Sequence, residues 1–120
     1  MKRPEQALQI ACMKYLKELG EVTKKCFSYH PANGGYRTPV EAAILKSMGV
    51  VSGVPDIVIH LHGGKSLFVE LKASKGKLTD NQESVHNILK GFGYRVEVIT
   101  AEHPQDAVNQ LNTIMIEEGI

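Results

Sequence analysis

Apolar residues recur along this chain with two periods, one typical of helices and one typical of strands. The helical period predicts helices over residues 4–19, 38–49, 79–92 and 104–118. The alternating period predicts strands over residues 25–30, 57–61, 67–71 and 95–99, the last an apolar interior strand. This order of elements predicts an α/β fold in which helices flank a mixed central sheet.

Helix ends and faces give more specific expectations. The first helix should end at Gly20, with its inward stripe formed by Leu8, Cys12, Tyr15, Leu16 and Leu19. Capping boxes predict where the second and third helices begin, at Thr38 with Glu41 and at Thr79 with Gln82. The third helix should bury Val85, Ile88, Leu89 and Phe92, and the fourth Ala107, Val108, Leu111 and Met115. Ile114 and Ile116 then lie off that stripe, either as part of a dimer surface or as harmless exposed aliphatics.

The two central strands carry charged residues on one predicted face. Residues two apart on a strand share a face, so Glu70 and Lys72 point the same way. A three-residue loop, Gly63-Gly64-Lys65, sets Asp56 across from Lys72, with Glu70 as its diagonal neighbour. A two-residue Gly-Gly turn would send the carboxylates to opposite faces, so we predict the three-residue loop.

These residue types together suit a divalent cation and a phosphodiester. Mg²⁺ prefers oxygen ligands and is usually held by one or two carboxylates, which Asp56 and Glu70 supply, with the Leu71 carbonyl as a further ligand. Lys72 is placed to orient the attacking water or to stabilise charge on phosphorus. The alternative is a surface hairpin in which Glu70 merely pairs with a lysine.

This set of residues resembles the VRR-NUC branch of the PD-(D/E)xK nuclease superfamily. The resemblance rests on Gly49 and Gly53 before Val54-Pro55-Asp56, on Glu70-Leu71-Lys72, on Asn33-Gly34-Gly35 and on Gln82. The Val-Arg-Arg that names the branch is missing, and Tyr94-Arg95-Val96 lies nearest its place. The resemblance implies a three-layer restriction-endonuclease-like fold and a DNA endonuclease that uses Mg²⁺, with Mn²⁺ able to substitute.

The resemblance also implies roles for residues outside the strands. It brings Glu5 to the metal centre, whereas position alone makes Glu5 a solvated helix start. Asn33 would contact DNA or orient a ligand, or else serve only as a left-handed turn residue. Gln82 would support the lysine or the attacking water in addition to capping its helix.

Composition narrows the possibilities further. The chain has 120 residues, so we expect one domain over residues 1–120. Its formal charge of +1 gives no support by itself for a polyanion partner. Positive charge is densest just after Lys72, and we expect Lys75 and Lys77 to contact the DNA backbone. The sequence shows neither a secretory signal nor a membrane span, which predicts a cytoplasmic protein without a membrane partner.

The predicted partner is DNA. By resemblance to stand-alone phage and bacterial proteins, we expect a homodimer that cuts branched DNA such as four-way junctions, because two symmetric sites suit a two-fold substrate. The alternatives are a general, flap- or nick-directed nuclease and a DNA-binding module without activity.

Histidines and cysteines are not expected to bind the metal. Mg²⁺ does not favour imidazole, so His30, His60 and His62 are expected in packing or surface roles, although His60 shares the face of Asp56. Cys12 and Cys26 lack metal-type spacing and are expected as reduced core residues.

Overall fold

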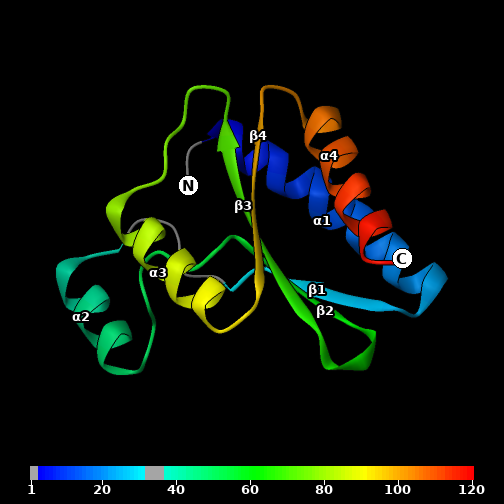
Figure 1. Cartoon of the computed structure of the whole chain (residues 1–120). Coiled ribbons are helices and arrows are strands. Elements are labelled where there is room, and N and C mark those ends of the chain that lie inside the picture. Colours follow the sequence, from blue (N-terminus) through cyan, green and yellow to red (C-terminus); the bar gives the residue numbers. More distant parts are fainter. Residues whose placement is uncertain (1–2, 32–36) are drawn as a thin grey trace.

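The computed structural model describes residues 3–31 and 37–120 and confirms an α/β fold with a mixed sheet (Figure 1). Within these residues the helices are α1 (Arg3–Thr23), α2 (Pro39–Ser47), α3 (Asp80–Gly91) and α4 (Pro104–Glu117). The strands are β1 (Cys26–Tyr29), β2 (Ile57–Leu61), β3 (Ser66–Ala73) and β4 (Arg95–Ala101). They lie in the order β1-β2-β3-β4, with the first two pairings antiparallel and the third parallel.

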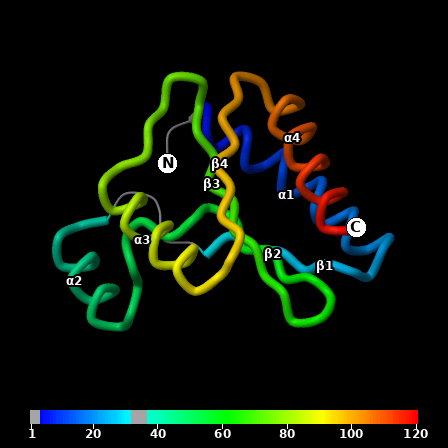
Figure 2. The backbone as a smooth tube through the Cα atoms, viewed as in Figure 1, coloured from blue at the N-terminus to red at the C-terminus, as the bar shows by residue number. Residues whose placement is uncertain are grey.

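The sheet lies between helices on both sides, which confirms the three layers. α1 and α4 lie side by side against one face, and α3 lies on the other side of β3 and β4 (Figures 1 and 2). The core fills the space between the sheet and the α1–α4 pair, and its largest fully buried side chains include Leu8, Leu16, Ile57, Ile59, Leu67, Leu71, Ile99, Leu111 and Met115. Cys12 is buried in this core and Cys26 is partly buried, both as free thiols.

The first helix continues beyond its predicted end at Gly20. It runs to Thr23, and the chain then leaves it through Lys24, which has a positive φ of 58°. A Cβ on Gly20 would come within 2.7 Å of the Cys26 carbonyl oxygen. The glycine therefore lets β1 pass close to the helix and does not end it.

Several predicted faces differ from those observed. On α3 the buried residue is His86, whereas Ile88 and Phe92 are 57% and 74% exposed, so the stripe through these two was wrong. On α4 the inward set is confirmed, but Ile114 is also buried, and Ile116 alone of that pair is exposed.

The last strand is an edge strand in the sheet that the structure describes, not an interior one. β4 is apolar because α4 packs against it from one side and α3 from the other. No helix in residues 3–31 or 37–120 is both long and apolar enough to span a bilayer.

Candidate active site

Strands β2 and β3 pair in a register shifted by two residues from the predicted one. Ile57 lies opposite Val69, and continuing this register sets Asp56 opposite Glu70. The predicted pairing of Asp56 with Lys72 was therefore wrong. A shift by two leaves every side chain on its predicted face, so the two carboxylates and the lysine remain on the same side of the sheet.

The position of the hairpin loop causes this shift. Three residues form the loop, as predicted, but they are His62–Gly64. Lys65 lies after the loop, where its carbonyl oxygen accepts a hydrogen bond from Leu61 N at 2.7 Å. Gly63 and Gly64 have φ values of 79° and 77°, in the left-handed region that glycine adopts readily.

Glu70 and Asp56 form a close carboxyl pair. Glu70 is 2% exposed, and burial raises its pKa to about 9, with hydrogen bonding and like charge from Asp56 adding to the effect. The positive charge of Lys72 acts in the opposite direction. Asp56 is oriented by Leu71, whose backbone N–H donates to Asp56 Oδ2 at 2.8 Å. Two carboxyl groups this close do not both ionise at neutral pH without compensating positive charge.

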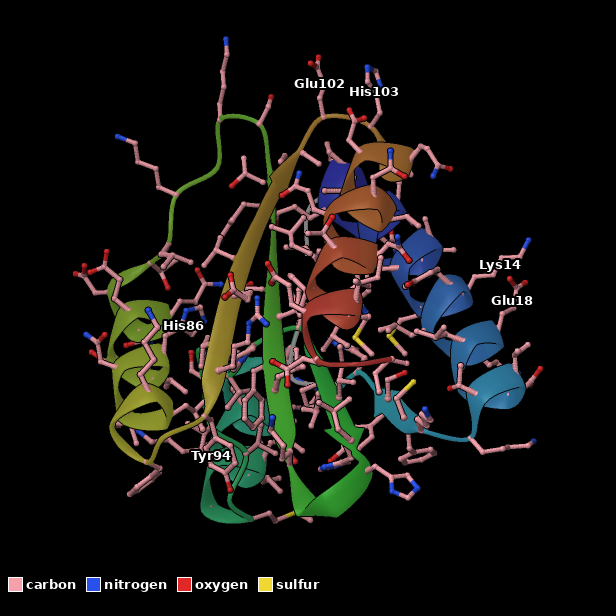
Figure 3. The ribbon with its side chains drawn as sticks, turned by 45° about the vertical axis from the view of Figure 1, so that its right-hand side comes forward. Lys14, Glu18, His86, Tyr94, Glu102 and His103 are labelled. Carbon is pink, nitrogen blue, oxygen red and sulfur yellow. The ribbon has the colours of Figure 1, made fainter. Side chains whose placement is uncertain are left out.

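Two side chains of α3, one helical turn apart, hold the Glu70 carboxylate. Gln82 Nε2 donates to Glu70 Oε2 at 3.3 Å, and His86 Nε2 lies 3.2 Å from Oε1. Figure 3 shows His86 on the side of α3 that faces the strands. Burial lowers the pKa of His86, so the ring is neutral at pH 7, and its Nε2–H tautomer donates to Glu70 Oε1.

The sequence prediction missed His86, although the signal was present. Residues four apart on a helix share a face, and Gln82 was already expected on the side that faces the sheet. The predicted apolar stripe through Ile88 and Phe92 hid this signal, because it rotated the expected buried face of α3 away from His86.

Gln82 caps its helix as well as contacting the site. Its Oε1 accepts a hydrogen bond from Thr79 N at 2.9 Å, while Thr79 Oγ1 accepts one from Gln82 N at 3.2 Å. This is the predicted capping box. The Gln82 amide contacts Glu70, so any support that it gives to Lys72 is indirect.

The glycine before the Asp56 loop fixes how that loop meets α3. Gly53 has a φ of 91°, and a Cβ there would lie 2.6 Å from the Asn81 carbonyl oxygen. Close packing of this loop on the first turn of α3 sets the distance between Asp56 and the helix that holds Glu70. His30 adds a second restraint, because its Nδ1 donates to the Asp56 carbonyl oxygen at 2.6 Å.

Glu5 and Lys72 complete the site. Glu5 Oε2 accepts a hydrogen bond from Ala73 N at 3.2 Å, and its charge contributes to the raised pKa of Glu70. Glu5 is therefore held beside the site, and its role toward a metal stays a prediction. Lys72 is 7% exposed and forms none of the ion pairs found within residues 3–31 and 37–120.

The remaining predicted site residues are Lys75, Lys77, Leu71 and Asn33. Lys75 and Lys77 are exposed on the loop between β3 and α3, at the top of Figure 1, and their contact with DNA stays a prediction. The side chain of Leu71 is buried in the core, so only its backbone is available to the site. Asn33 lies outside the described residues.

The donors fit a hydrated divalent cation. Within residues 3–31 and 37–120 no cluster of three or more His, Cys, Asp or Glu side chains is arranged to hold a metal. Two opposed carboxyl groups are nevertheless present in Asp56 and Glu70, and Mg²⁺ commonly takes one or two carboxylates and keeps several waters. A bound cation would also supply the positive charge that lets both carboxyl groups ionise at neutral pH.

A comparison with known protein families found a matching domain model. The family model for the VRR-NUC domain matches residues 3–103, a span that contains the carboxyl pair, Lys72, Gln82 and His86. The chain belongs to the VRR-NUC family of nuclease domains. As a VRR-NUC domain, it is a nuclease-family member for which DNA is the implied substrate.

Solved structures show the same fold. One, described as "VRR_NUC domain protein", superposes with a TM-score of 0.68 at 23% identity over 94% of this chain and 88% of the other. A second, described as "VRR_NUC domain", gives a TM-score of 0.57 at 22% identity over 90% and 94%. A comparison with curated protein sequences found no match.

Proposed function

We propose that this VRR-NUC domain is a metal-dependent endonuclease that hydrolyses phosphodiester bonds in branched DNA. The observation that carries the proposal is the carboxyl pair of partly buried Asp56 and buried Glu70, with Lys72 on the same face of the sheet. Membership of a nuclease family supports the reaction class and DNA as the substrate. The requirement for metal and the preference for branches are our inference.

In this proposal Asp56 and Glu70 hold Mg²⁺, for which Mn²⁺ substitutes, with the Leu71 carbonyl and Glu5 as further ligands. The bound cation would lower the pKa of a water molecule attached to it and neutralise charge on the scissile phosphate. Lys72 orients the attacking water or stabilises the charge that develops on the phosphate oxygens. This ammonium is available because it forms no ion pair with the described acidic residues.

The surrounding residues position the carboxylates and the substrate. Gln82 and His86 fix the two oxygens of Glu70, so the carboxylate does not rotate when a cation binds. Lys75 and Lys77 lie on the exposed loop that follows β3, the strand of Lys72, and contact backbone phosphates of the DNA.

The proposal is tested by incubating the protein with labelled four-way junction, flapped duplex and linear duplex, each with Mg²⁺, Mn²⁺ or EDTA. Symmetric nicking of the junction, lost in EDTA, is expected. Equal cutting of all three substrates would support a general nuclease, and binding without cleavage would support a DNA-binding module. Asp56→Asn should remove cutting while keeping the hydrogen bond to Leu71, whereas Asp106→Asn, an exposed residue of α4, should cut normally.

A second copy of the chain is the partner that this proposal requires. α2 has no buried residue within the described chain, and its apolar stripe of Val40, Ile44 and Met48 is 69%, 53% and 75% exposed. An isologous interface places one patch against itself, and Glu41 and Lys46 leave the helix with balanced charge for such a contact.

The partner is tested by measuring mass in solution by light scattering. The protein should have the mass of a dimer, and Ile44→Glu should shift it to a monomer. Ile10→Glu is the matched control, because Ile10 is 66% exposed on a different helix. A monomeric parent protein would refute the dimer without affecting the assignment of the catalytic residues.

A further inference from the structure

A row of aromatic side chains lies on the same face of the sheet as the carboxyl pair. Phe27 of β1 pairs with His60 of β2, and Tyr29 is two residues from Phe27 on the same face. His60 is four residues from Asp56, which places it about 13 Å along the strand. We call Phe27, Tyr29 and His60 the aromatic row.

The aromatic row is exposed and continuous. Phe27 is 68% exposed and Tyr29 is 40% exposed. The ring centroids of Phe27 and Tyr29 are 5.9 Å apart, and those of Tyr29 and His60 are 5.4 Å apart. Isolated exposed apolar residues are common, but three rings in which Tyr29 contacts the other two form a surface on which flat ligands can stack.

Hydrogen bonds hold two of these rings, Tyr29 and His60, in place. Tyr29 Oη lies 3.0 Å from His60 Nε2, and His60 Nδ1 lies 2.7 Å from Ser66 Oγ. The Tyr29 and His60 rings are therefore ordered before any ligand arrives, which lowers the entropy cost of binding.

Positive charge lies beside the aromatic row. A shallow hollow of about 240 Å³ is lined by Phe27 and His60 together with Lys24, Lys25 and His62. No Asp or Glu lines this hollow among the residues that the structure describes. Such a surface complements a chain of aromatic bases joined by phosphates.

We propose that the aromatic row stacks unpaired bases of a DNA strand whose phosphates contact Lys24 and Lys25. The inference rests on the proposed function and names its substrate class, which is DNA with a single-stranded segment about 13 Å along the strand from Asp56. Bases within a duplex already stack on each other, whereas unpaired bases leave their faces free for aromatic side chains. The surface therefore selects the unpaired strand at a branch.

Binding is tested by fluorescence, because the chain contains no tryptophan. Phe27→Trp places a single reporter in the aromatic row, and Phe92→Trp places one at a 74% exposed control position on α3. In EDTA, a twelve-nucleotide oligothymidylate should quench the emission of Phe27→Trp, while a blunt duplex should not. Emission of Phe92→Trp should stay constant with either DNA. Unchanged emission of Phe27→Trp with oligothymidylate would overturn the proposal.

Cleavage gives a second test. Phe27→Ala should lower kcat/KM on flapped duplex about tenfold and leave kcat/KM on continuous duplex unchanged. Phe92→Ala is the control, and thermal unfolding should show that both variants keep the fold. Equal loss on both substrates would overturn the proposal, as would a change of Phe27→Ala from dimer to monomer, which would make the row a protein interface. If the parent protein cuts no DNA, the proposed function fails, and quenching of Phe27→Trp still decides whether single strands bind here.

Discussion

Replacing His86 by leucine should weaken metal binding without unfolding the protein. The His86 side chain is buried, and its Nε2 lies 3.2 Å from Glu70 Oε1. Leucine fills a similar volume but donates no hydrogen bond. Glu70 would then keep only the Gln82 contact and could rotate away from Asp56.

The expected size follows from the kind of hydrogen bond that is lost. A hydrogen bond to a charged group is worth about 1.5–3 kcal/mol, and each 1.4 kcal/mol corresponds to about tenfold in an equilibrium constant. The dissociation constant for Mn²⁺ should therefore rise about 10- to 100-fold, in line with the usual effect of residues that orient metal ligands.

Calorimetric titration of Mn²⁺ into the protein measures this change. His86→Gln keeps an N–H donor near the position of Nε2 and should recover most of the affinity, whereas Asn87→Leu changes an exposed neighbour on the same helix and should have no effect. If His86→Leu bound Mn²⁺ as tightly as the parent protein, the positioning role of His86 would be refuted.

Two further substitutions test the scaffold. Gly53→Ala should lower the free energy of unfolding in urea by about 2 kcal/mol or more, because its Cβ would lie 2.6 Å from the Asn81 carbonyl oxygen. Gly49→Ala, also at positive φ but with nothing within 4 Å, should cost clearly less, and equal losses would contradict the steric argument. Glu118→Gln should cost about 1 kcal/mol, since hydrogen bonding from Arg95 lowers the pKa of Glu118 below its ordinary 4.5. A group with a lowered pKa stabilises the fold above its unfolded pKa, so the difference between Glu118→Gln and the parent should shrink as pH falls below about 4.5, and a constant difference would exclude this ion pair as the cause.

The sequence pattern predicts which face of the sheet carries the site, but not the register of its hairpin. Alternation of apolar and polar residues determines that Glu70 and Lys72 share a face with Asp56. The same alternation is satisfied by a three-residue loop that begins at either His62 or Gly63, and these two loops give registers that differ by two residues. Only backbone conformation and packing distinguish them.

Sequence patterns are similarly limited in predicting where a helix ends and which of its faces is buried. Gly20 reads as a helix end from local preference alone, yet a tertiary contact with Cys26 makes it an interior helix residue. His86 is polar, and a search for an apolar stripe passes over it even though it is buried against Glu70. Local patterns determine where elements occur, and contacts between distant segments determine how each one is used.

The first turn of α3 holds the Glu70 carboxyl group in place. Thr79 and Gln82 close this turn through their reciprocal hydrogen bonds, and the same Gln82 side chain reaches Glu70. Fraying at the start of the helix would therefore release an oxygen of Glu70, although Thr79 itself is exposed on the surface. Substitution of Thr79 would thus change nuclease activity without touching Glu70, because it would alter how well this helical turn is ordered.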